Sequence, residues 1–92
     1  MHAMKIPLLD LALLQTLIAV NQSGTLARAA ERVGRTQSAV SLQMQRLEEA
    51  VGLPLFDRQR RALVINEAGR SMVGYAERML ALNAEAVAYA RG

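Results

Sequence analysis

The chain has 92 residues, which is the length of one small domain or of one domain with an extended arm. Hydrophobic residues make up 52% and aromatic residues only 3%, so the core must be aliphatic, and the many alanines favour closely packed helices over a β-sandwich. The chain has no Cys, which excludes disulfides, thiolate metal sites and cysteine nucleophiles. Its one His is His2, so multi-histidine metal sites and histidine-based triads are excluded as well. Most enzyme chemistry is thereby excluded, and we expect no enzyme. No apolar run is long enough to span a membrane and no signal-peptide pattern opens the chain, so we expect no membrane partner.

The net charge of +3 is unevenly distributed along the chain. Seven arginines and four acidic residues lie between Arg28 and Arg61, so this segment carries the whole excess. Every basic residue except Lys5 is Arg, whose planar guanidinium makes forked contacts with phosphate groups or guanine. A solvated surface of salt bridges is the alternative interpretation.

A first helix is predicted over residues 8–21, where apolar residues recur at helical spacing. Pro7 stands at the first helical position, and Ser23-Gly24 ends the pattern. The apolar arc is broad and leaves a narrow polar strip, which consists of Gln15, Thr16 and Gln22. The preceding residues 1–7 have the pattern of a tag remnant and are expected to be a disordered start.

Two further helices are predicted with the spacing of a helix-turn-helix. Thr25 offers a hydroxyl cap for a short helix over residues 26–33, and Gly34-Arg35 breaks the pattern. Thr36 then caps a third helix that runs to about Val51.

The third helix has an unusual division of residues between its faces. Its apolar stripe consists of Ala39, Val40, Met44, Leu47, Ala50 and Val51, with Gln43 at the edge. The opposite face consists of Gln37, Ser38, Ser41, Leu42, Gln45, Arg46 and Glu49. Solvated helices usually place Lys and Glu on such a face, whereas Gln and Ser can hydrogen-bond base edges and phosphate oxygens. The pattern therefore indicates a nucleic-acid partner.

Two short β-favouring runs, residues 55–58 and 62–65, flank the tip Gln59-Arg60-Arg61 and predict a hairpin. Its cationic tip is suited to a phosphate group or to a minor groove. An Arg-rich loop without such a role is the alternative.

Asn66 is predicted to cap a long last helix over residues 67–91, with Glu67 in its first turn. Apolar residues cover more of this helix than one small core can bury, and the first helix shows the same excess. We therefore expect a homodimer interface, called the dimer seam below, that consists of Leu9, Leu13, Met72, Tyr75, Met79, Leu82, Ala86 and Tyr89. Missing parts of a longer chain are the alternative cover for this surface.

Residues 11–76 resemble the N-terminal DNA-binding domain of LysR-type transcriptional regulators. The resemblance rests on an ordered set of motifs, which are residues 26–33 (LARAAERV), 36–41 (TQSAVS), Leu47-Glu48, 52–58 (GLPLFDR) and 67–69 (EAG). It implies a mainly α winged helix-turn-helix of three helices and a two-stranded wing over residues 8–65, followed by a linker and dimerisation helix over residues 66–92.

The resemblance also implies what the chain does. The expected function is sequence-specific binding of double-stranded DNA, as a homodimer on an interrupted inverted repeat, at the bacterial nucleoid in the cytoplasm. The chain would be a fragment without a cofactor, because family members continue into a C-terminal domain that resembles periplasmic binding proteins and senses a small-molecule effector.

Site residues follow from the matched motifs and from the charges. The resemblance assigns base contacts in the recognition helix to Gln37, Ser38 and Ser41, a minor-groove contact to Arg58, and phosphate contacts to Thr25 and Thr36. The face of the third helix adds Gln45 as a base reader. Phosphate neutralisation is expected from the remaining arginines of the basic segment, namely Arg28, Arg35, Arg46, Arg60 and Arg61.

The chain departs from the family pattern at four positions. Leu42 stands where many members place Arg, so this position can touch a thymine methyl group but cannot donate to a base. Ala27 replaces a frequent Ser or Thr, Arg60 replaces a frequent Gly, and Asn66 replaces the usual Thr as a helix cap.

Three alternatives are open at this point. Another winged-helix family, such as the molybdate-responsive type, would bind DNA in the same way. A helical interaction module would explain the apolar helices but not the Gln and Ser face. An enzyme would require acid–base partners that the sequence does not provide.

Overall fold

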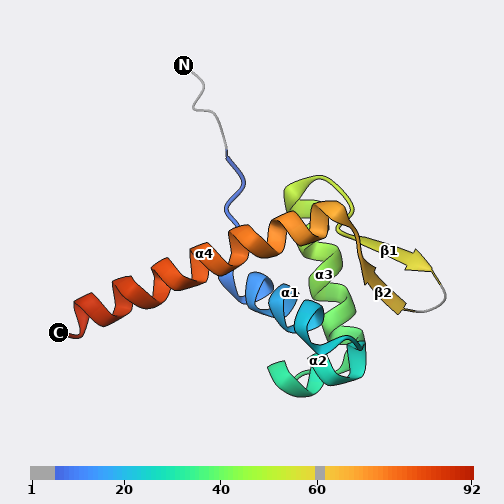
Figure 1. The fold of residues 1–92 in the computed structure, drawn as a ribbon, viewed down its shortest axis with the longest axis horizontal. Coiled ribbons are helices and arrows are strands. Elements are labelled where there is room, and N and C mark those ends of the chain that lie inside the picture. The colour runs from blue at the N-terminus through green and yellow to red at the C-terminus, as the bar shows by residue number, and fades with distance from the viewer. Residues whose placement is uncertain (1–5, 60–61) are drawn as a thin grey trace.

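The structure, a computed structural model, describes residues 6–59 and 62–92. The elements in chain order are α1 (Leu11–Ser23), α2 (Leu26–Val33), α3 (Gln37–Val51), β1 (Phe56–Gln59), β2 (Ala62–Ile65) and α4 (Glu67–Ala90). Figure 1 shows α1, α2 and α3 packed together, the hairpin at one side, and α4 lying along α1 and extending beyond it. The predicted winged helix-turn-helix with a long final helix is confirmed.

The start of α1 differs from the prediction. The side chain of Asp10 accepts a hydrogen bond from the backbone N–H of Ala12 at 2.8 Å, and the helix begins at Leu11. The predicted start at residue 8, with Pro7 as the first helical residue, is therefore wrong, because a carboxylate that satisfies a free N–H sets the helix start. Of the predicted tag remnant, residues 1–5 lie outside the described residues, while Ile6 precedes α1 and is exposed.

The helix-turn-helix forms as predicted. Thr25 Oγ1 accepts from the N–H of Arg28 at 3.2 Å and caps α2. Gly34 ends α2 with a φ of 69°, in the left-handed region that glycine adopts without strain. Thr36 Oγ1 then accepts from the N–H of Ala39 at 3.1 Å and caps α3. Two caps and one glycine thus define the whole turn.

The wing pairs one residue further than predicted. β1 and β2 are antiparallel, with Phe56 opposite Ile65 and Gln59 opposite Ala62. Gln59 therefore belongs to β1 and not to the tip, because it continues the backbone pairing. The remaining tip residues, Arg60 and Arg61, lie outside the described residues.

The core is aliphatic apart from Phe56, as the composition predicts. Its largest fully buried side chains are Leu14, Leu17, Val40, Met44, Leu47 and Leu55. α1 packs against α2, α3 and α4 and so forms the centre of the helical layer. The position of each other helix therefore depends on its contact with α1.

The first turns of α4 are tied to the segment that precedes the wing. Asn66 Oδ1 accepts from the N–H of Gly69 at 2.8 Å and caps α4, while Asn66 Nδ2 donates to the carbonyl oxygen of Pro54 at 3.1 Å. A Cβ at position 69 would overlap the carbonyl oxygen of Leu55 and lie 2.5 Å from Ile65 Cγ1. Glycine is therefore required where α4 crosses this backbone.

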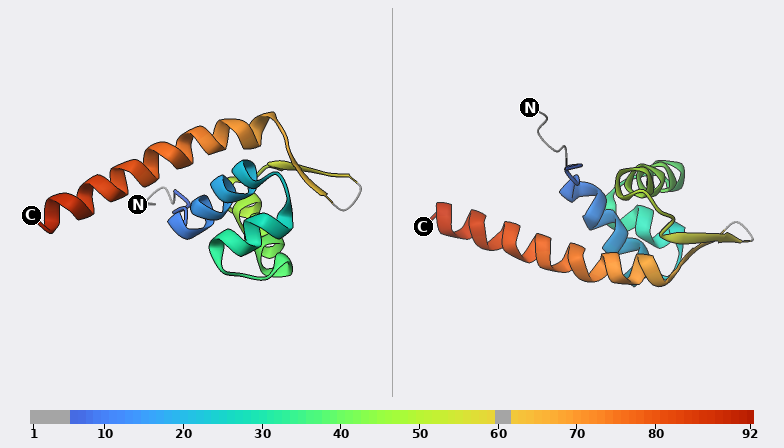
Figure 2. Two further views of the ribbon diagram at one scale, coloured as in Figure 1. Left: turned by 60° about the horizontal axis from the view of Figure 1, so that its bottom comes forward. Right: turned by 90° about the horizontal axis from the view of Figure 1, so that it is seen from above.

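The rest of α4 leaves the domain. Residues 81–90, called the outer half of α4 below, are all exposed. Figure 2 shows this part projecting at the end of the molecule opposite the wing. Within residues 6–59 and 62–92, no helix combines the length and the hydrophobicity needed to cross a bilayer.

Candidate nucleic-acid interface

The base-reading residues predicted from the sequence lie on α3 between its first residue, Gln37, and Gln45 near its middle. Gln37, Ser38 and Gln45 are exposed, and Ser41 is half-buried. These four residues, called the reading face below, share one side of the helix with Leu42, which is 46% exposed. The described surface at this point is polar but uncharged, and it places amides and hydroxyls together with one apolar side chain. Such a surface can donate to and accept from base edges.

Hydrogen bonds fix the start of the reading face. Thr36 Oγ1 lies 3.3 Å from Ser38 Oγ, in addition to its capping bond with Ala39. The first turn of α3 is thus held by two contacts with one threonine. Side chains that are held before a partner arrives lose less entropy on binding.

The predicted phosphate contacts on α2, in the turn and on α3 are accessible to solvent. Arg28 on α2, Arg35 in the turn and Arg46 on α3 are all exposed. Thr25 and Thr36 are exposed as well, and each stands at a helix N-terminus, where free N–H groups and the helix dipole attract anions. The structure therefore leaves these five residues accessible from solvent, as a phosphate contact requires.

The wing is attached directly to the end of α3. Glu48 Oε2 accepts from the backbone N–H groups of Leu55 at 2.8 Å and Phe56 at 3.3 Å. The wing strand therefore starts at a fixed position relative to the recognition helix. Arg58 lies in β1 opposite Leu63, and the predicted tip contacts Arg60 and Arg61 lie outside the described residues.

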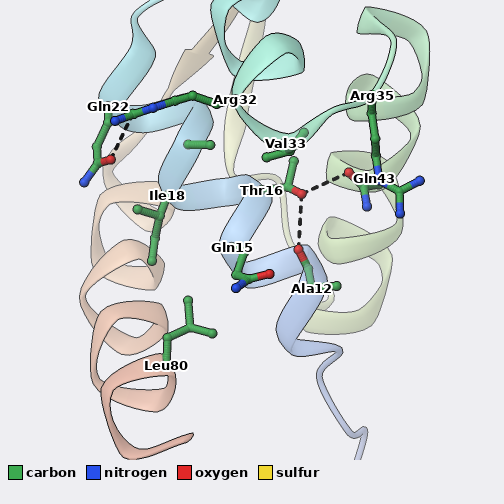
Figure 3. Close-up of a pocket in the computed structure, with 11 residues that line it drawn as sticks. Ala12, Gln15, Thr16, Ile18, Gln22, Arg32, Val33, Arg35, Gln43 and Leu80 are labelled. Atoms are coloured by element: carbon green, nitrogen blue, oxygen red, sulfur yellow. Dashed lines mark hydrogen bonds between the residues drawn. The ribbon is translucent and has the colours of Figure 1, made fainter. Parts of the chain in front are cut away.

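The predicted position of Thr16, in an exposed polar strip on α1, is wrong. Thr16 is 2% exposed, and its hydroxyl donates to Gln43 Oε1 on α3 at 3.0 Å. Gln15 and Gln22, the other members of the strip, are exposed and line an open groove formed by α1, α2, α3 and α4 (Figure 3). The residues three and four positions from Thr16 are all apolar (Ala12, Leu13, Ala19 and Val20), which is the sequence signal that a core position was possible.

The predicted dimer seam divides into two groups. Leu9, Leu13, Met72 and Met79 are partly buried against the core of the chain itself. The remaining members are exposed: Tyr75 at 52%, Leu82 at 64%, Tyr89 at 88%, and Ala86. The guanidinium of Arg78 lies 4.7 Å from the centre of the Tyr75 ring. A large apolar surface on one side of α4 is thus left uncovered by the described chain.

These features define a class of protein. A capped helix-turn-helix, a wing fixed to the recognition helix and a long projecting helix are the parts of a winged helix-turn-helix DNA-binding domain. The model of the family described as bacterial regulatory helix-turn-helix protein, lysR family, matches residues 11–70. The chain belongs to this family. This membership excludes the alternative of another winged-helix family, such as the molybdate-responsive type.

Curated relatives support the same assignment. The transcriptional regulator PecT of Dickeya dadantii is 51% identical over 80 residues, which cover 87% of this chain and 25% of PecT. The regulator DgdR of Burkholderia cepacia is 44% identical over 80 residues, which cover 87% of this chain and 27% of DgdR. The chain thus spans about a quarter of the length of these relatives. They are regulators of transcription, in agreement with the expectation of a DNA-binding protein and not an enzyme.

Solved structures agree with the fold. The DNA-binding domain of CbnR in complex with DNA superposes with a TM-score of 0.84 at 31% identity, and covers 90% of this chain and 95% of that chain. Full-length LysG of Corynebacterium glutamicum with bound effector Arg superposes with a TM-score of 0.78 at 32% identity, over 91% of this chain and 29% of LysG.

Proposed function

We propose that the chain binds double-stranded DNA sequence-specifically as a homodimer, with one copy on each half-site of an interrupted inverted repeat. The observation that carries this proposal is the reading face, which is polar, uncharged, accessible and anchored by the Thr36 cap. A recognition helix that enters the major groove needs such groups to distinguish base pairs. The complex of the CbnR domain with DNA supports the same mode of binding.

Each group of residues has a distinct role in this proposal. Gln37, Ser38, Ser41 and Gln45 read bases, and Leu42 beside them packs on a thymine methyl group. Phosphate contacts set affinity and salt dependence, and they are made by Thr25, Arg28, Arg35, Thr36, Arg46, Arg60 and Arg61. Arg58 on the wing enters the flanking minor groove.

The exposed dimer seam supplies the second half of the proposal. A second copy would cover Tyr75, Leu82, Ala86 and Tyr89 by a two-fold arrangement in which each copy offers the same surface. The interface would leave the reading face of both copies free, because the outer half of α4 projects away from α3 (Figure 2). Two reading faces at a fixed separation would then recognise an inverted repeat.

The whole protein is proposed to respond to a small molecule. The chain covers 25% and 27% of two curated relatives, and LysG holds its effector Arg in a chain of which this domain is 29%. A further effector-binding domain would bias the separation of the two reading faces. With DNA as its partner, the protein would act at the bacterial nucleoid, in the cytoplasm.

Selection from a pool of random duplexes, followed by salt titration of the enriched sequences, tests the proposal. We expect an interrupted inverted repeat and a steep fall of affinity with salt. A steep fall without an enriched sequence would contradict base reading by this domain. Absence of binding at low salt would overturn DNA binding altogether and favour the helical interaction module.

A further inference from the structure

Thr16 is the one buried polar or charged side chain among the residues that the structure describes. Its hydroxyl Oγ1 lies 3.0 Å from Oε1 of Gln43 on α3 and 3.1 Å from the carbonyl oxygen of Ala12, and one proton serves both oxygens. Figure 3 shows these two bonds meeting at Thr16, with Gln43 reaching across from α3. The bond to Gln43 joins α1 directly to the recognition helix.

The other buried side chains of α1 and α3 are apolar. The largest of them are Leu14, Leu17, Val40, Met44 and Leu47, all fully buried. Contacts between apolar side chains have no preferred direction, and the unbranched side chain of Met44 adapts to small displacements. A hydrogen bond, in contrast, weakens steeply when it is misaligned. The Thr16–Gln43 bond therefore distinguishes one rotation of α3 about its axis from neighbouring rotations that the apolar contacts tolerate.

The rotation of α3 decides where the reading face points. Gln43 is two residues from both Ser41 and Gln45, which places it on the opposite side of the helix at about 200° of rotation. Any rotation of α3 moves both sides by the same angle. Hydrogen bonds from the reading face to base edges require side chains that are held to within about 10–20° of the productive orientation.

We propose that Thr16 is a positioning residue for DNA reading. Its hydroxyl holds Gln43, and through Gln43 it fixes the rotation at which α3 presents the reading face to the bases. Thr16 itself touches no DNA, since it is buried beneath α3. This inference rests on the proposed function, and it adds to the base-reading residues one that acts from the core.

The test compares the binding of two duplexes of equal length, the selected operator and a random sequence, at one salt concentration. In Thr16→Val the side chain keeps its shape and loses the hydroxyl, so we expect the ratio of operator to random affinity to fall about fivefold, with random binding unchanged. Thr16→Ser retains the hydroxyl and is expected to restore the ratio to within about twofold of the original chain.

Two further variants separate positioning from stability. Val73→Ala removes buried apolar volume from α4, which packs on α1 and β2, so it should lower the melting temperature and leave the ratio unchanged. Gln43→Met should lower the ratio as Thr16→Val does, and the double variant should lower it no further, because both changes remove one bond.

Each result decides the matter. The positioning role would be overturned if Thr16→Val left the ratio of operator to random affinity unchanged. It would also be overturned if Val73→Ala, with a melting temperature equal to that of Thr16→Val, lowered this ratio by the same factor. Additive losses of the ratio in the double variant would overturn it as well. The original chain provides the separate check on the proposed function. If it shows no preference for any operator, that function fails, and this inference fails with it.

Discussion

The exposed surfaces of α3 and of the outer half of α4 differ in both chemistry and support. The reading face of α3 is polar, begins at a double hydrogen bond to Thr36, and is backed by the core along its length. The outer half of α4 presents Leu82 and Tyr89, and all of its residues are exposed. One surface is held in place before any partner arrives, whereas the other extends into solvent with apolar side chains.

The difference indicates two kinds of partner. Base edges are recognised by hydrogen bonds, which depend on direction, so the residues that make them must be held by the fold. An apolar interface depends on the area removed from water and tolerates a less constrained helix. In the proposed function, the surface that the fold holds in place binds DNA and the projecting surface binds a second copy, so we expect that the two can be disrupted separately.

The largest effect is expected from a charge in the outer half of α4. Leu82→Asp should weaken the dimer by roughly 3–6 kcal/mol, or more than 100-fold in Kd, because each copy loses a buried leucine and buries a carboxylate. Sedimentation velocity over a range of concentrations measures this change. The melting temperature of the monomer should stay constant, since Leu82 is 64% exposed within the chain.

Ala84→Asp is the matched control for that change. Ala84 is exposed and stands on the other side of α4, so a carboxylate there should leave the dimer intact. Equal dissociation of both variants would mean that charge on α4, and not the dimer seam, controls association.

Substitutions near the N-terminus of α4 should change the stability of the domain and not its dimerisation. Gly69→Ala should destabilise the domain by about 3 kcal/mol, because its Cβ overlaps the carbonyl oxygen of Leu55, and backbone cannot move aside cheaply. Gly74→Ala meets no atom within 4 Å and should stabilise the helix by about 0.5–1 kcal/mol. Urea unfolding followed by circular dichroism compares the two. If Gly69→Ala left the free energy of unfolding unchanged, α4 would not pack closely against the backbone of Leu55.

A substitution in the reading face should change the DNA sequence preference. Gln37→Ala should cost about 1–3 kcal/mol on the operator and relax one or two base positions, as for a lost base contact. Gln15→Ala, an exposed glutamine on α1, should change neither affinity nor preference. Repeating the selection with each variant gives both quantities. Equal weakening of Gln37→Ala on operator and random duplexes would assign Gln37 to a phosphate contact instead.

The sequence predicted those parts of the fold that depend on neighbouring residues. Thr25, Thr36 and Asn66 each cap the helix that follows within three residues, and local patterns locate them well. The start of α1 was misplaced because Leu8 and Leu9 extend the apolar pattern beyond the Asp10 cap. An apolar pattern marks which residues suit a helix, and it does not by itself mark where the helix starts.

Contacts between distant residues were not predicted. Glu48 accepts from the backbone of residues 55 and 56, Gly69 lies against Leu55, and Thr16 meets Gln43. Each depends on how two elements cross, which no single helical period encodes. The assignments of base-reading and dimer-seam residues stay predictions, since their partners lie outside the chain.

The smallest effect is expected from a single phosphate contact. Arg28→Gln should lower the slope of log affinity against log salt by about one and weaken operator and random duplexes alike, because counterion release does not depend on sequence. Arg91→Gln is the control, since Arg91 is exposed at the C-terminal end of α4, which projects away from α3. Fluorescence anisotropy at several salt concentrations gives both slopes. If Arg28→Gln changed the operator alone, α2 would contribute to base reading, and the division between a reading face on α3 and a phosphate surface around it would have to be redrawn.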